Sequence, residues 1–252
     1  MVGDAISHSV LPGIVIAYLI AGDMQSIWML VGAGILGILT TFLIEFFHQK
    51  GQLQTDASIG VTFTWLFALG VILVTYYAGN AHIDQDCILY GEIAYVPIDL
   101  VYDNSGNAIG PKAVIILSAV LLIILTFIGL FYKELFITTF DASFAKAIGI
   151  SASKWHYILM GLVSLTTVAS FESVGAILVV ALLIAPAASA YLITNQLKPM
   201  LVISSVFGIL SSVFGYMLAY ALDGSIAGAM VTVSGIIFGL CYAVAQFKKV
   251  NK

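Results

Sequence analysis

Long apolar stretches separated by short polar segments dominate the chain. Eight stretches come close to the roughly 20 residues that an α-helix needs to cross a bilayer. They lie at about 5–22, 26–47, 57–78, 113–132, 155–172, 174–195, 199–221 and 225–246. The break at 172–174 is short enough to be the tip of a re-entrant hairpin. The pattern predicts an all-α, polytopic integral membrane protein with about eight transmembrane helices, forming one domain over 1–252.

Composition supports a membrane location and excludes several classes of protein. The chain is 61% hydrophobic and 9% charged, whereas soluble domains carry about 25% charged residues. Its nine basic residues are all lysines and are scattered, so nucleic acid is not an expected partner. The two cysteines, Cys87 and Cys241, are too far apart in sequence to indicate a disulfide framework or a zinc site of cysteines.

The lysines also predict the orientation in the membrane, since cytoplasmic loops carry an excess of Lys and Arg. With the C-terminus in the cytoplasm, the predicted spans put the polar segment 133–154 and most lysines inside. The acidic segment 79–112 then lies outside, with Lys112 at its end. We therefore expect a multi-pass protein of the cell membrane with a cytoplasmic C-terminus.

Two ionisable residues, Asp4 and His8, stand at the start of the first apolar stretch. Four residues apart, they share one face of a helix, and ionisable groups within a membrane are costly enough to indicate a function. A carboxylate and an imidazole suit Mn²⁺ or Zn²⁺, although two ligands do not complete a site. The alternative is that Asp4 caps the helix and His8 makes an interhelical hydrogen bond; spacing alone leaves both open.

Two other acidic residues lie near helix ends. Glu172, between two apolar stretches, either lines a permeation path or is an outward-facing charge at a helix junction. Glu45 and His48 stand beside Lys50 and are expected to form a solvated cytoplasmic helix end. Small residues elsewhere, such as the Gly-Ala-Gly run at 32–34, allow helices to pack closely.

The segment 140–149 (FDASFAKAIG) predicts a short amphipathic helix inside the cytoplasmic loop. Asp141 is a candidate N-cap and Gly149 a candidate C-terminal stop. Too short to span a membrane, such a helix either docks into a groove on another protein or lies on the lipid surface.

Four segments together resemble the permeases of the manganese/zinc/iron ATP-binding-cassette importers. They are GDAISHSVLPG at 3–13, DASIGVTFTWLFALG at 56–70, the segment 140–149, and VGAILVVALLIAPAASA at 174–190. The resemblance covers nearly the whole chain in the same order. It also implies a further helix and a basic segment before the first motif, whereas this sequence begins two residues before Gly3.

The resemblance implies a type II ABC importer fold and a set of partners. These are a second permease copy, two cytoplasmic ATP-binding subunits and an extracellular metal-binding lipoprotein. Asp4 and His8 match the positions that coordinate the ion in transit, and Glu172 is a further candidate ligand. The expected coupling helix, which docks on the ATPase, comprises Phe140, Asp141, Phe144, Ala145, Ala147, Ile148 and Gly149.

Transport by alternating access would then be driven by ATP hydrolysis on the partner, because this chain contains no Gly-x-x-x-x-Gly-Lys-Ser/Thr loop. Mn²⁺, Zn²⁺ or Fe²⁺ is expected as the transported substrate, with no permanently bound cofactor. A permease for a siderophore or cobalamin is the alternative, but Asp4 and His8 argue against it. An ion-coupled carrier would show inverted repeats, and a membrane metalloprotease would show a His-Glu-x-x-His helix. Neither feature is found in this sequence, which argues against both alternatives.

Overall fold

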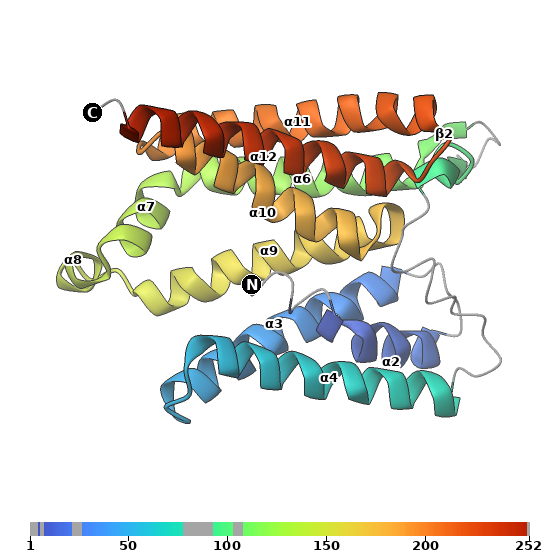
Figure 1. Cartoon of the computed structure of the whole chain (residues 1–252). Helices are drawn as coiled ribbons and strands as arrows, with labels where there is room; N and C mark the ends of the chain where they lie inside the picture. The colour runs from blue at the N-terminus through green and yellow to red at the C-terminus, as the bar shows by residue number, and fades with distance from the viewer. Residues whose placement is uncertain (1–4, 6–7, 22–26, 78–92, 103–107, 251–252) are drawn as a thin grey trace. The chain divides into compact units, whose positions relative to one another are not determined.

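The computed structural model describes residues 5, 8–21, 27–77, 93–102 and 108–250. The long helices are α2 (Leu11–Ala21), α3 (Ile27–Gln49), α4 (Thr55–Tyr77), α6 (Lys112–Leu130), α9 (Ala152–Val174), α10 (Ala176–Ile193), α11 (Leu197–Leu222) and α12 (Ile226–Val250). Each corresponds to one of the eight predicted stretches, which confirms the all-α polytopic class (Figure 1). Only Gly175 separates α9 from α10.

The apolar character of these helices fits a lipid environment. Within the described residues, five helices are long and apolar enough to cross a membrane, and two shorter ones are apolar. α6 has the highest mean hydropathy, 3.0, yet only 6% of its most apolar window is buried. Because exposing so much apolar surface to water is costly, this helix requires lipid or another protein around it.

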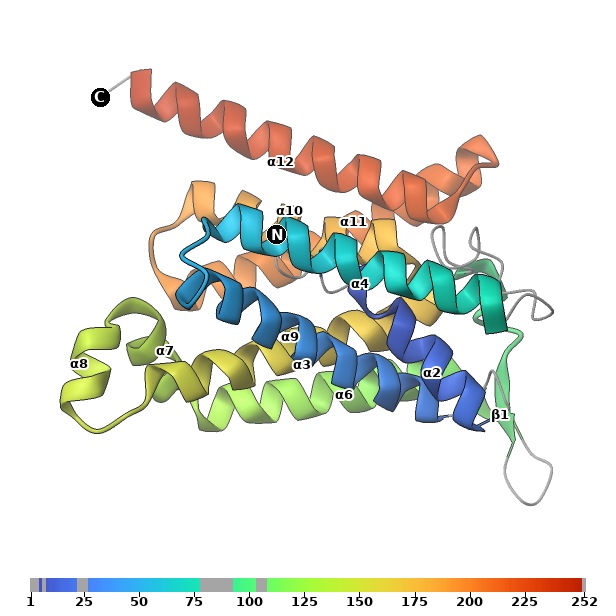
Figure 2. The same ribbon diagram turned by 90° about the horizontal axis from the view of Figure 1, so that it is seen from below.

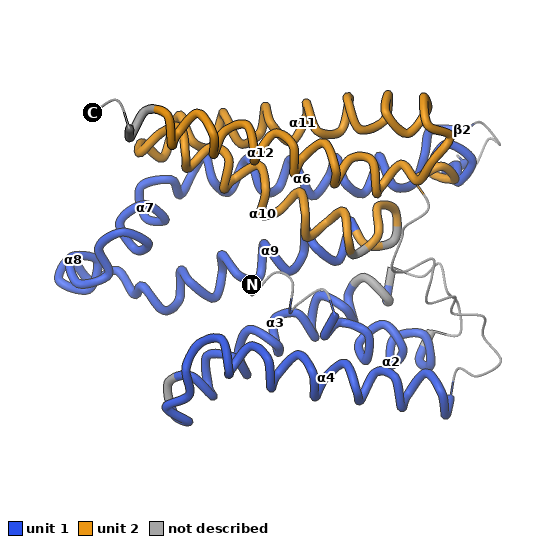
Figure 3. The backbone as a smooth tube through the Cα atoms, in the orientation of Figure 1, with its two compact units in different colours: residues 1–84, 97–170 blue, residues 85–96, 171–252 orange. Residues whose placement is uncertain are grey.

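The chain divides into two compact units (Figure 3). Unit 1 comprises Met1–Asp84 and Pro97–Ser170, and unit 2 comprises Gln85–Val96 and Phe171–Lys252. The boundary falls inside α9, near its C-terminal end.

In unit 1, α2, α3 and α4 lie side by side (Figures 1 and 2). Small residues allow this close packing. A methyl group added at Gly13 of α2 would lie 2.5 Å from the carbonyl oxygen of Gly32 on α3. One added at Gly70 of α4 would lie 2.9 Å from the side chain of Leu11. Helix association in lipid depends on such close van der Waals packing, so these glycines bring the three backbones together.

Unit 1 also contains α6 and α9, which contact each other through aromatic rings. Trp155 of α9 lies 5.2 Å from Phe131 and 6.0 Å from Phe127, measured between ring centroids. Two short helices, α7 (Tyr132–Phe140) and α8 (Ala142–Ala147), connect α6 to α9 and lie beyond their ends (Figures 1 and 2).

Unit 2 is built around α10, α11 and α12, which pack against one another. α11 ends at Leu222 and is capped by Asp223, whose φ of 53° is left-handed. α12 starts three residues after Asp223. α10 contains Pro186. Unit 2 also includes the short 3-10 helix η1 (Ile93–Tyr95).

A small hairpin in the segment 79–112 was not predicted from sequence. β1 (Leu100–Tyr102) pairs antiparallel with β2 (Ala108–Pro111), which leads directly into α6. The strands have three and four residues, too few for an alternating pattern to stand out.

Candidate functional site

The structure places His8 just before α2, against helix α4. The centroid of its imidazole lies 6.0 Å from that of Phe63 and 6.1 Å from that of Phe67, and the latter contact is edge to face. The two phenylalanines lie one turn apart on α4 and restrict the orientation of the half-buried imidazole. Asp4, its predicted partner, lies outside the described residues.

The residue after His8 ties the same turn to α3. The hydroxyls of Ser9 and Thr40 are fully buried and their oxygens lie 2.7 Å apart. Thr40 also donates a hydrogen bond of 2.7 Å to the carbonyl oxygen of Leu36 in its own helix. The turn that carries His8 is therefore held by a hydrogen bond to α3 and by ring contacts to α4.

Glu172, the third predicted ligand, lies in the last turn of α9, and its side chain is not described. It belongs to unit 2, whereas His8 belongs to unit 1. Among the residues that the structure does describe, no three His, Cys, Asp or Glu side chains are grouped so as to hold a metal ion. The predicted ligand set therefore stays a prediction.

The short helix predicted at 140–149 is present as α8. Asp141 caps it, since its carboxylate accepts a hydrogen bond of 2.9 Å from the backbone N–H of Phe144. The C-terminal end is a Schellman motif, in which Ile150 donates to the carbonyl of Ala145 at 2.8 Å and Gly149 has a φ of 84°. Both predicted ends of the helix are confirmed.

The surroundings of α8 differ in detail from the predicted apolar face. Phe140 ends α7 and does not begin α8. Ala145 is fully buried, whereas Phe140, Phe144 and Ile148 are 63%, 53% and 49% exposed. α8 therefore has a buried side within unit 1 and presents large apolar side chains outward.

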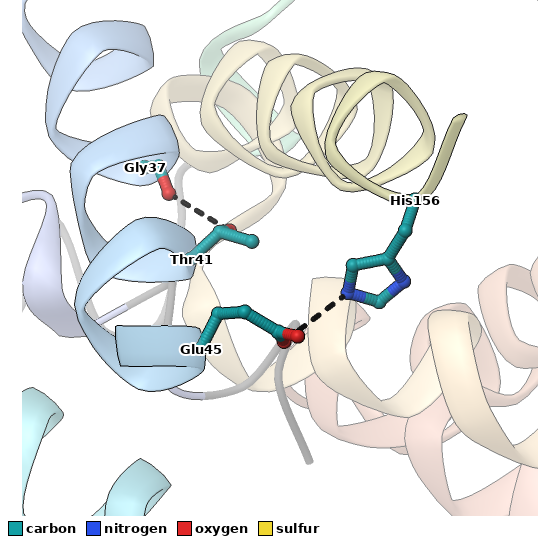
Figure 4. A network of polar contacts seen from close by, with 4 residues as sticks. All are labelled: Gly37, Thr41, Glu45 and His156. Carbon is teal, nitrogen blue, oxygen red and sulfur yellow. Dashed lines mark hydrogen bonds and ion pairs between the residues drawn. The ribbon is translucent and has the colours of Figure 1, made fainter. Parts of the chain in front are cut away.

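Glu45 of α3 is paired with His156 of α9 (Figure 4). The carboxylate Oε2 lies 3.8 Å from the imidazole Nε2, and the side chains are 25% and 44% exposed. Four residues earlier on α3, Thr41 bonds back to the carbonyl of Gly37 (Figure 4). The sequence grouped Glu45 with His48 and Lys50 at a helix end, but the Nδ1 of His48 lies 2.9 Å from the carbonyl oxygen of Leu53.

His156 was not among the residues predicted from the sequence. Its one signal is an ionisable side chain two residues after Lys154, at the start of an apolar helix. Its pairing with Glu45 joins segments that lie far apart in the chain, and no local pattern reports such a contact.

These features define a polytopic α-helical membrane protein, with an imidazole packed against α4 and a capped helix between α7 and α9. Residues 1–245 match the ABC 3 transport family. The chain belongs to this family.

Similar proteins have been named for metal transport. The chain is 50% identical to the manganese transport system membrane protein MntD of Bacillus subtilis over 97% of its own length and 81% of that protein. It is 43% identical to the zinc transport system membrane protein TroD of Treponema pallidum over 96% of its length and 65% of that protein. The solved structure of PsaBC from Streptococcus pneumoniae in complex with Fab superimposes with a TM-score of 0.78 at 33% identity, covering 99% of this chain and 84% of that one.

Proposed function

We propose that this chain is the membrane-spanning permease subunit of an ATP-driven importer of a divalent transition-metal ion. Manganese is the substrate expected first. The same ligands could also bind zinc or iron. The observation that carries the proposal is the 50% identity to a manganese transport system membrane protein over 97% of the chain. The permease itself is non-catalytic, and a separate subunit hydrolyses ATP.

In this proposal Asp4 and His8 bind the ion in transit, and Glu172 is a further ligand on the path. The surroundings of His8 support this role. Phe63 and Phe67 restrict its ring, and a restricted ligand loses less conformational freedom when it binds an ion. Few protein ligands also suit transport, because an ion held too tightly is not released.

The segment 140–149 couples the permease to cytoplasmic ATP-binding subunits. The exposed Phe144 and Ile148 support this, because apolar side chains on a short capped helix fit a groove on a partner. Coupling of this kind would drive alternating access. The full importer would contain a second permease copy and an extracellular metal-binding lipoprotein that delivers the ion to the side of segment 79–112. In the same proposal, residues 1–252 form a single permease domain and the C-terminus lies in the cytoplasm.

Metal uptake tests the transit site. Cells lacking their own manganese uptake would express the chain with its ATPase and binding protein, and accumulation of Mn²⁺, Zn²⁺ and Fe²⁺ would be measured separately. Asp4→Ala and His8→Ala should each reduce uptake by at least about tenfold, since each removes a direct ligand. His48→Ala, which changes an exposed histidine at the end of α3, should not. Wild-type uptake in both ligand variants would refute the assignment.

Co-purification tests the coupling helix separately. Phe144→Asp and Ile148→Asp should abolish recovery of the ATPase with the permease, because a buried unpaired charge is costly. Ser143→Asp introduces the same charge at an exposed position of α8 and serves as the control. Equal ATPase recovery in all three variants would exclude α8 as the docking helix.

A further inference from the structure

The pair formed by Glu45 and His156 offers the same two kinds of ligand, a carboxylate and an imidazole, as the predicted pair of Asp4 and His8. Glu45 lies near the end of α3 and His156 near the start of α9, and their side chains point toward each other (Figure 4). Both side chains are partly exposed, at 25% for Glu45 and 44% for His156.

The separation of the two polar atoms is informative. At 3.8 Å, Oε2 and Nε2 are farther apart than the 2.7–3.2 Å typical of an N–H···O hydrogen bond. Two atoms that bind the same tetrahedral ion at about 2.1 Å each are roughly 3.4 Å apart. A small side-chain rotation would therefore let both atoms bind one ion.

We propose that Glu45 and His156 are a second, weak binding site for the transported divalent metal ion. The inference rests on the proposed function, because it takes the ion from the proposed path. The carboxylate and the imidazole supply two ligands that suit Mn²⁺, Zn²⁺ and Fe²⁺, and water completes the coordination. A site with only two protein ligands releases its ion readily, as a transport path requires.

The flanking residues assign this site to the exit end of the path. Lys50 directly follows α3, and Lys154 lies in the first turn of α9. Lysines next to membrane spans mark the cytoplasmic side. Only residues 148–151 separate α8 from α9, so a displacement of α8 would reach His156 and change its distance from Glu45. Coupling to the ATPase would then regulate release of the ion.

The main competing explanation is an interhelical ion pair without metal. Such an ion pair contributes little to stability, and it needs the negative charge of the Glu45 carboxylate. The proposed metal site instead needs one donor atom from each of the two side chains, whether or not that atom belongs to a carboxylate. Replacing Glu45 with histidine distinguishes the two, because it removes the carboxylate while keeping a ligand for the ion.

Manganese binding to the purified full chain in lipid nanodiscs tests the site, with free Mn²⁺ measured by electron paramagnetic resonance. A His8→Gln background removes the imidazole of the proposed transit site. In that background Glu45→Gln and His156→Gln should each weaken Mn²⁺ binding by at least about tenfold. Glu45→His should retain binding, and His48→Gln on the same helix end should leave it unchanged. Circular dichroism and size exclusion would verify that every variant is folded.

The outcomes separate this site from the proposed function. Equal Mn²⁺ affinity in all variants, or an absence of Mn²⁺ binding in the His8→Gln background, would overturn the second site. So would a Glu45→His variant that binds as weakly as Glu45→Gln. If uptake is unaffected by Asp4→Ala and His8→Ala while His156→Gln still weakens binding, the transit site fails and the Glu45–His156 site stands.

Discussion

Gly32 of α3 is expected to tolerate no added side-chain atom at the α2–α3 contact. A methyl group added there would lie 2.6 Å from the carbonyl oxygen of Gly13 and 2.7 Å from the methyl group of Ala17. Ordinary van der Waals contact begins at 3.4 Å, so α2 and α3 would have to separate by nearly 1 Å. Overpacking of this kind costs about 1–3 kcal/mol.

Gly34, two residues further along α3, provides a matched control. A methyl group added at Gly34 would meet nothing within 4 Å. Gly32→Ala and Gly34→Ala both gain the roughly 1 kcal/mol by which alanine exceeds glycine in helix propensity. This gain cancels when the two variants are compared. The difference between them therefore isolates the cost of forcing the helices apart.

The assay is thermal unfolding of the purified chain in detergent at one fixed heating rate, followed by the fluorescence of its three tryptophans. A difference of 1–3 kcal/mol corresponds to a midpoint roughly 2–12 °C lower for Gly32→Ala than for Gly34→Ala, at 2–4 °C per kcal/mol for a chain of this size. Equal midpoints would refute the close contact between α2 and α3.

Two further predictions concern α8 and the imidazole of the candidate site. Asp141→Ala should cost about 1 kcal/mol of local stability and raise the rate of amide hydrogen exchange in α8. Asp141→Asn can still cap the helix and should leave exchange unchanged. Equal exchange rates in the two variants would contradict the role of the cap. Phe63→Leu removes a ring next to His8 and should weaken Mn²⁺ binding roughly two- to tenfold, the equivalent of an aromatic pair worth about 0.5–1.5 kcal/mol. Trp65→Leu, at a 56% exposed position of the same helix, should leave binding unchanged, and equal affinities would show that the ring contact does not orient the ligand.

The helices and the class of protein were predictable because they depend on local properties. A run of apolar residues long enough to span a bilayer forms a helix almost regardless of its neighbours, since backbone groups in lipid must bond within their own segment. The ends of α8 were predictable for the same reason, because Asp141 and Gly149 act on backbone groups within a few residues. The hairpin of β1 and β2 was missed because its strands are very short.

The sequence by itself determined the eight apolar helices and the capped helix α8, and it predicts that Asp4 and His8 share one helical turn. Only the tertiary structure decided which residues meet across helices. It distinguishes Gly32, which touches α2, from Gly34, which does not, and it brings His156 to Glu45. The physical reason is that helix periodicity and capping act over about one turn, whereas these contacts depend on how whole helices pack.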